Sequence, residues 1–82
     1  MMRLLLFGQV RDGAEHLHGT EIDADAHSVR ELVDWLSKRD RDLAHALNRS
    51  GLRFAVDRRF ADLDTEIDGK SEVALMSPMS GG

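Results

Sequence analysis

The sequence contains no cysteine, a single proline and few aromatic residues. Without cysteine, a disulfide framework, a thiolate metal site and a cysteine nucleophile are all excluded. Long apolar runs are also missing, since the run near the N-terminus spans only residues 4–7. Such a run is far too short for a signal-peptide core or a membrane span. We therefore expect a cytoplasmic protein with no membrane partner.

Conventional binding and catalytic motifs are absent as well. The net charge is −4, and the densest basic spot is the pair Arg58-Arg59, which argues against a nucleic-acid partner. No glycine-rich loop for nucleotide phosphates occurs, and no serine, histidine and acid have a spacing that supports nucleophilic catalysis. His16 and His18 could share a strand face and hold a metal weakly, but exposed surface histidines are the better interpretation. We predict no metal site.

Two apolar runs at opposite ends of the chain predict the centre of a sheet. Residues 4–7 and 73–76 are both unbroken, which is typical of strands covered on both faces. Two stretches in which apolar and polar residues alternate less regularly predict flanking strands, each with one solvent-exposed face. The alternating residues are Leu17, Thr20 and Ile22 in the first, and Leu52, Phe54 and Val56 in the second.

The strongest helix signal begins at Ser28. Ser28 and Glu31 have the spacing of a capping box. In this motif the side chain of each residue accepts a hydrogen bond from the backbone N–H of the other. The residues that follow form an apolar stripe of Val29, Leu32, Val33 and Leu36. Trp35 lies beside this stripe, where packing at the core edge is favoured over a partner contact. A second short helical piece is expected over residues 43–47, and Asp68-Gly69 predicts a tight turn.

The order of these elements predicts an α+β fold of the β-grasp type. A right-handed crossover through the helix makes the first and last strands parallel neighbours at the centre of the sheet. We expect a mixed sheet of four to five strands with one main helix across one face. Residues 1–77 form this domain, and residues 78–82 form an extended tail.

The tail P-M-S-G-G has an unusual composition for the end of a domain. Gly81 and Gly82 cannot fill a core, and a glycine pair is most useful where the backbone enters a space too narrow for a Cβ atom. Pro78 prevents the last strand from continuing. Extended at about 3.4 Å per residue, the tail reaches roughly 17 Å, far enough to enter a partner's active site. A frayed end is the alternative, and the combination with the β-grasp order favours a functional tail.

The whole chain resembles the family of molybdopterin synthase small subunits, sulfur carriers related to the thiamine-pathway carrier and, more distantly, to ubiquitin. The resemblance rests on L-L-L-F-G-Q-V-R-D, S-V-R-E-L, F-A-V-D, D-G-K-S-E-V-A and P-M-S-G-G. Members usually carry an aromatic residue and a second proline where this chain has Met76 and Ser77. The serine predicts a less rigid tail root, and the methionine predicts a softer interface contact.

The resemblance implies a mechanism that needs no catalysis by this chain itself. An E1-like adenylating enzyme would use ATP to activate the carboxylate of Gly82, and a sulfur donor would then convert it to a thiocarboxylate. In a hetero-oligomer with the large subunit of molybdopterin synthase, this group would donate sulfur to a pyranopterin precursor. No cofactor would bind to the chain. The resemblance assigns partner binding to residues at the end of the chain: Leu75, Met76, Ser77, Pro78, Met79, Ser80 and Gly81.

Three alternatives remain open on the sequence alone. The chain could carry sulfur for thiamine or for another pathway. It could also be a ubiquitin-like modifier whose Gly82 forms isopeptide bonds with lysines of other proteins. Finally, it could be a β-grasp interaction module with an unreacted end.

Overall fold

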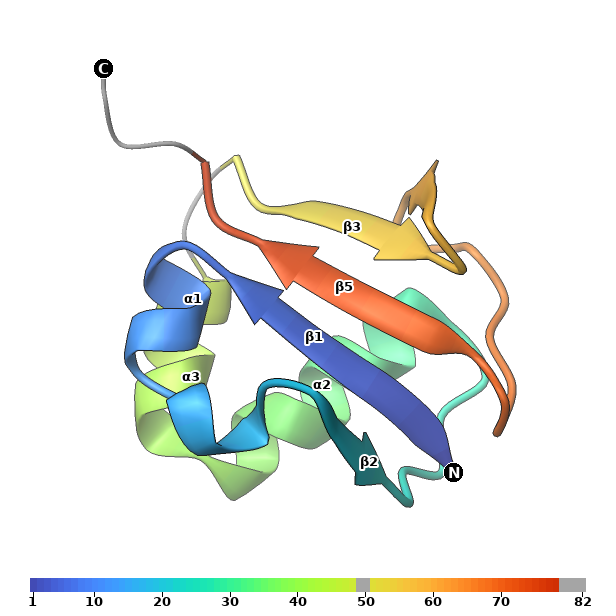
Figure 1. Ribbon diagram of the computed structural model, residues 1–82, viewed down its shortest axis with the longest axis horizontal. Helices are drawn as coiled ribbons and strands as arrows, with labels where there is room; N and C mark the ends of the chain where they lie inside the picture. The colour runs from blue at the N-terminus through green and yellow to red at the C-terminus, as the bar shows by residue number, and fades with distance from the viewer. Residues whose placement is uncertain (49–50, 79–82) are drawn as a thin grey trace.

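The computed structural model describes residues 1–48 and 51–78 (Figure 1). The strands are β1 (Met2–Phe7), β2 (Thr20–Ile22), β3 (Arg53–Val56), β4 (Arg59–Ala61) and β5 (Glu72–Met76). The helices are α1 (Gln9–Asp12), the 3-10 helix η1 (Glu15–Leu17), α2 (Val29–Arg39) and α3 (Arg41–Leu47).

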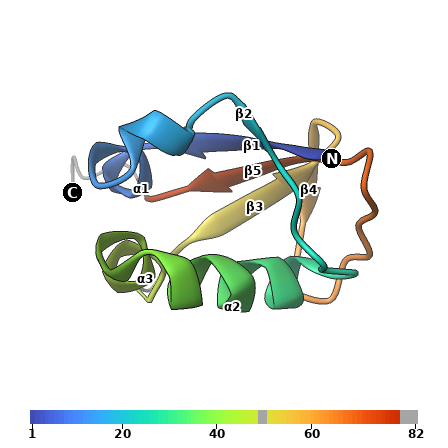
Figure 2. The ribbon, with the colours of Figure 1, turned by 90° about the horizontal axis from the view of Figure 1, so that it is seen from below.

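The strands form one mixed sheet in the order β2-β1-β5-β3-β4. The central strands β1 and β5 are parallel, with Leu4 opposite Val73, and the other pairs are antiparallel. Helices α2 and α3 lie on one side of this sheet (Figure 2). The predicted β-grasp fold, with parallel first and last strands and a main helix across one face, is therefore confirmed.

The expectation that both central strands are covered on both faces is wrong for β1, which alternates between buried and more exposed residues. It is confirmed for the middle of β5, where Val73, Ala74 and Leu75 are all buried. Met2, Leu4 and Leu6 of β1 are buried, whereas Leu5 is half-buried and Phe7 is exposed. Successive strand residues point to opposite faces, and α2 packs on one face only. The core lies between that face and the buried α2 residues, which are Val29, Leu32 and Leu36.

Helix α2 begins with only half of the predicted capping box. Ser28 Oγ accepts a hydrogen bond from the Glu31 backbone N–H at 3.2 Å. The Glu31 carboxylate accepts from the N–H of His27, also at 3.2 Å, rather than from Ser28. Ser28 also forms an isolated β-bridge with Glu66, in which the Val29 N–H donates to the Thr65 carbonyl and the Ile67 N–H donates to the His27 carbonyl. Farther along α2, Trp35 packs half-buried at the core edge, as expected, beneath the Arg39 guanidinium.

The segment between β1 and β2 contains two short helical turns that the sequence pattern did not predict. Helix α1 has only four residues, too few to show a helical period, and it is held by the buried side chain of Val10. Leu17, expected near a strand, belongs to η1, and β2 spans only three residues. Both turns pack against β1, and α1 also packs against β5.

Candidate functional site

The end of β5 leads into the tail root, which we define as Ser77 and Pro78. The Ser77 backbone N–H donates a hydrogen bond to the carbonyl of Phe7 at 3.1 Å. Its hydroxyl accepts a hydrogen bond from the backbone N–H of Val10 at 2.8 Å. The main chain of Ser77 is thus bound to the last residue of β1, and its side chain is bound to α1, which follows that strand.

These two bonds correct the expectation that a serine at position 77 loosens the tail root. A proline there would have neither a backbone N–H for Phe7 nor a hydroxyl for Val10. The serine supplies both groups. Its hydroxyl also gives α1 a side-chain acceptor that the helix lacks locally, since the N-cap residue is Gly8.

Two glycines stand directly against the tail root. Gly8 has a φ of 74°, and a Cβ atom placed on it would lie 3.1 Å from the Cβ of Ser77. Gly51 has a φ of 84°, and its Cβ atom would lie 3.2 Å from Cγ of Pro78. Glycine is the residue that tolerates both the positive φ and this close approach.

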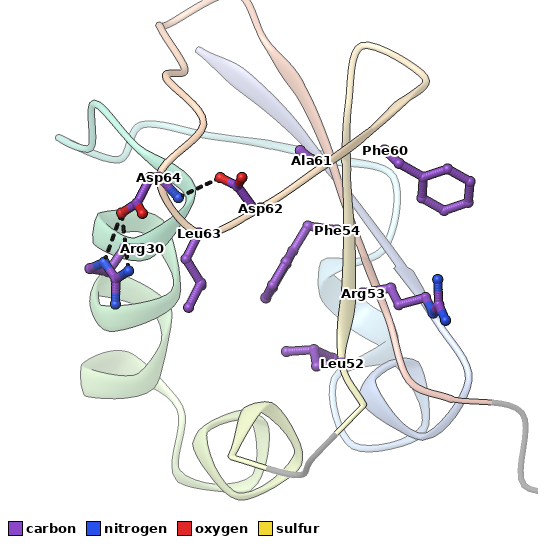
Figure 3. Close-up of a pocket in the computed structure, with 9 residues that line it drawn as sticks. All are labelled: Arg30, Leu52, Arg53, Phe54, Phe60, Ala61, Asp62, Leu63 and Asp64. Carbon is purple, nitrogen blue, oxygen red and sulfur yellow. Dashed lines mark hydrogen bonds and ion pairs between the residues drawn. The ribbon is translucent and has the colours of Figure 1, made fainter.

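The sheet face opposite α2, called the open face below, adjoins the tail root. Among the described residues, no helix lies over this face of β3 and β5 (Figure 2). Figure 3 shows the two sides of β3 directly: Leu52 and Phe54 point toward the α2 side, whereas Arg53 and Phe60 point away from it. The residues of the open face follow from this alternation and from the register of the strands.

Side chains on the open face form three rows across the strands. The row beside the tail root joins Phe7, Met76 and Arg53. The middle row is apolar and consists of Leu5, Ala74, Ala55 and Phe60. In the third row, farthest from the tail, Arg3 stands between Glu21 and Glu72.

The two rows nearest the tail expose a large apolar area. Phe60 is 79% exposed and Phe7 is 42% exposed, and both are large hydrophobic residues. A hollow at this end is lined by Phe7, Gly8, Gln9, Arg11, Asp12, Arg53, Phe60, Met76, Ser77 and Pro78. Exposed apolar residues that are contiguous and rimmed by polar residues typically mark an interaction surface. The open face therefore offers a partner an apolar surface that reaches the point where the tail leaves.

The structure separates the predicted site residues into four groups. Leu75 belongs to the core and has no exposed side-chain surface, which removes it from the residues that a partner can touch. The physical reason is strand alternation: Leu75 faces α2, and Met76 next to it faces the open side. Ser77 and Pro78 form the tail root. Met79, Ser80, Gly81 and Gly82 lie outside the described residues.

Sequence reasoning missed Phe7, Phe60 and the two glycines of the tail root. Strand alternation from the buried Leu4 and Leu6 would have placed Phe7 on the open face. The sequence contains no signal for Phe60, because the side of the sheet on which its side chain lies depends on how the short strand β4 pairs with β3. Nothing in the local sequence places Gly51 against Pro78.

A second hollow lies between α2 and the strands β3 and β4 (Figure 3). Leu52, Phe54 and Leu63 line it, and the guanidinium of Arg30 pairs with the carboxylate of Asp64 at 3.0 Å at its rim. Its acidic residues are engaged in local turn and ion-pair contacts, such as that of Asp62 Oδ1 with the Asp64 backbone N–H. These contacts are structural, and the described residues that line the hollow include no set of groups suited to catalysis.

The histidines singled out in the sequence have separate structural roles. His18 Nδ1 accepts a hydrogen bond from the Leu6 N–H at 3.0 Å, and its ring meets Phe7 edge-on. His16 is in η1 and lies 3.9 Å from the Asp40 carboxylate. Within residues 1–48 and 51–78, no three histidine or acidic side chains could together hold a metal ion. In the same part of the chain, no helix has the length and apolarity needed to cross a membrane.

Comparisons with known proteins agree with this geometry. The model of the ThiS family matches residues 4–82. The crystal structure of SAMP1 from Haloferax volcanii superposes with a TM-score of 0.77 at 21% identity, covering 99% of this chain and 98% of that one. At this identity the match to SAMP1 shows a shared fold. No curated protein matches the sequence.

Proposed function

Because the chain belongs to the ThiS family of small ubiquitin-like sulfur carriers, we propose that it carries sulfur as a thiocarboxylate on Gly82 for molybdopterin synthesis. The observation on which the proposal chiefly rests is the family match, which extends through the terminal Gly-Gly pair. The anchored tail root beside the apolar end of the open face supports it.

The proposed chemistry takes place on the main chain. A carboxylate is a poor electrophile, so an E1-like enzyme joins a carboxylate oxygen of Gly82 to the α-phosphorus of ATP and releases pyrophosphate. A sulfur nucleophile from a donor then attacks the carbonyl carbon and displaces AMP. The resulting thiocarboxylate sulfur attacks the pyranopterin precursor and forms a thioester, and water then cleaves the C–S bond at Gly82, which leaves the sulfur on the precursor and a carboxylate on the carrier. Acid and base groups for these steps come from the partner enzymes.

The folded domain contributes recognition and placement. Phe7, Met76 and Phe60 give the partner's surface an apolar contact area, and the tail root directs the following residues toward its active site. Glycine at positions 81 and 82 allows the backbone to pass a constriction that excludes a Cβ atom. In this proposal the chain works as the small subunit of a cytoplasmic hetero-oligomer with the large subunit of molybdopterin synthase.

The choice of pathway is supported by the helical segment after α2. Helix α3 is a separate seven-residue helix with its own cap, in which Asp40 Oδ1 accepts from the Leu43 N–H at 3.0 Å. The shorter thiamine carrier is expected to lack this piece, and the molybdopterin subunit is expected to contain it. A thiamine-pathway carrier is the alternative within the same chemistry.

Reconstitution tests the proposal. The chain is incubated with an E1-like enzyme, ATP and a sulfur source, and intact mass is measured; replacement of one oxygen by sulfur is expected, with reactions lacking ATP as the control. The product is then combined with a molybdopterin synthase large subunit and the precursor, and dithiolene formation is measured. Absence of the sulfur mass gain in the presence of ATP would refute sulfur carriage. A mass gain without dithiolene formation would refute the pathway.

The same activated Gly82 could react with a lysine amine instead of a sulfur donor, which is the modifier alternative. Blots of tagged protein from cells distinguish the two functions. A ladder of larger conjugates indicates a modifier, and a single band indicates a carrier. A variant without Gly81 and Gly82 loses either function, whereas a plain interaction module keeps its binding.

A further inference from the structure

We propose that the hydroxyl of Ser77 is a positioning group: by accepting the N–H of Val10 it sets the direction in which the main chain leaves the domain toward Gly82. The inference rests on the sulfur-carrier function proposed above. It adds that the domain itself, and not only the partner's channel, orients the reactive end.

The two hydrogen bonds of Ser77 restrain different parts of the residue. The bond from its N–H to the Phe7 carbonyl, at 3.1 Å, continues the pairing of β1 and β5 one residue beyond the strand. The bond to its hydroxyl, at 2.8 Å, fixes the side-chain rotamer. Together the two bonds hold N, Cα and Cβ of Ser77 and so fix the direction of its Cα–C bond, and the following Pro78 restricts ψ of Ser77 to extended values.

The group that Ser77 binds is itself firmly held. Val10 lies in the first turn of α1, and its side chain is completely buried in the core. The first N–H groups of a helix have no partner within the helix, so each needs an external acceptor. Gly8 occupies the N-cap position and has no side chain, and the Ser77 hydroxyl takes the place of a local cap.

The close contacts of Gly8 and Gly51 with the tail root also restrict its movement. Ser77 is close to Gly8, and Pro78 is close to Gly51, at separations that would leave only 3.1 and 3.2 Å to an added Cβ atom. Two loops therefore limit sideways displacement of two consecutive residues. The hydroxyl bond can be removed by a single substitution at position 77, which leaves the sequence of both loops unchanged.

Orientation at the tail root matters because Gly82 is only four residues beyond Pro78. Extended at about 3.4 Å per residue, those residues span roughly 14 Å. A short tether with a fixed origin keeps its end near one place and raises the effective concentration of the carboxylate in a docked enzyme. Loss of the restraint should lower kcat for activation and leave KM nearly unchanged, since the open face is untouched.

The test compares Ser77→Thr with Ser77→Val, which have the same branched shape and differ by a hydroxyl in place of a methyl group. We measure kcat and KM for ATP-dependent adenylation by the E1-like enzyme. Ser77→Val should lower kcat on the order of fivefold, the size expected for one hydrogen bond, whereas Ser77→Thr should stay near wild type. Equal kcat for all three proteins, or equal loss in both variants, would overturn the proposal.

Two measurements on the isolated chain are independent of sulfur chemistry. Hydrogen exchange should show faster exchange of the Val10 amide in Ser77→Val than in Ser77→Thr, and ¹⁵N relaxation should show a lower order parameter at Met79. Circular dichroism confirms that both variants are folded. If the order parameters are identical, Ser77 does not orient the tail. If they differ but wild type is never adenylated, the positioning role stands and the proposed function fails.

Discussion

Phe7 and Met76 are register partners on the parallel strands β1 and β5 and lie side by side on the open face. Met76 directly precedes the tail root. One is the last residue of its strand and the other the last residue before Ser77. This pair joins the apolar surface to the base of the tail. A partner that covers it is therefore brought to the tail root.

We predict that Phe7→Ser and Met76→Ser each weaken binding to the large subunit at least tenfold, because each removes apolar contact area at the centre of the proposed interface. The measurement is the Kd from isothermal titration calorimetry. Arg3→Ser in the distant charged row is the matched control and should change Kd less than twofold. Equal effects at all three positions would contradict the assignment of the interface to the apolar rows.

Leu75→Ala should lower the free energy of unfolding by about 2–5 kcal/mol, since it leaves a cavity in the core beneath α2. Met76→Ala, at the adjacent position, should cost less than about 1.5 kcal/mol because its side chain is only half-buried. Urea unfolding followed by circular dichroism measures both. Similar losses for the two variants would show that the two residues do not face opposite sides of the sheet.

Gly8→Ala and Gly19→Ala separate backbone strain from contact with the tail root. The two glycines have φ values of 74° and 76°, so both substitutions impose strain of about 1–3 kcal/mol. Only at Gly8 would the new Cβ atom meet Ser77; at Gly19 nothing lies within 4 Å. Gly8→Ala should therefore be the more destabilising in urea, and it alone should alter the amide chemical shifts of Ser77 and Val10. Identical behaviour would argue against close packing at the tail root.

His18→Leu should lower the free energy of unfolding by about 1–3 kcal/mol, because the part-buried N–H of Leu6 loses its acceptor. The ring nitrogen accepts this N–H two residues beyond Leu4, where the pairing of β1 with β2 ends. His16→Leu is the control, since its imidazole is exposed and bonds no strand. Thermal or urea unfolding of both variants gives the comparison, and equal stabilities would remove the structural role assigned to His18.

Much of the fold could be predicted from the sequence. The apolar stripe from Val29 to Leu36 and the two apolar runs indicated a helix packed on two central strands, because burial of apolar residues follows the period of each element. The short helix α1 escaped prediction, since four residues are too few for a period to show. Its stability depends on the buried Val10 and on an acceptor supplied by Ser77, far away in sequence.

The candidate site divides in the same way. Composition and order determined by themselves that the chain has no cysteine, that it forms a β-grasp domain, and that Pro78 and the glycines follow the last strand. Tertiary structure decided that Leu75 is core and Met76 is surface, that Phe60 joins the open face, and that Ser77 and Pro78 rest against Gly8 and Gly51. The reason is physical: apolar periodicity and turn chemistry act between neighbours in the chain, whereas strand register and backbone contacts arise only when distant segments pack together.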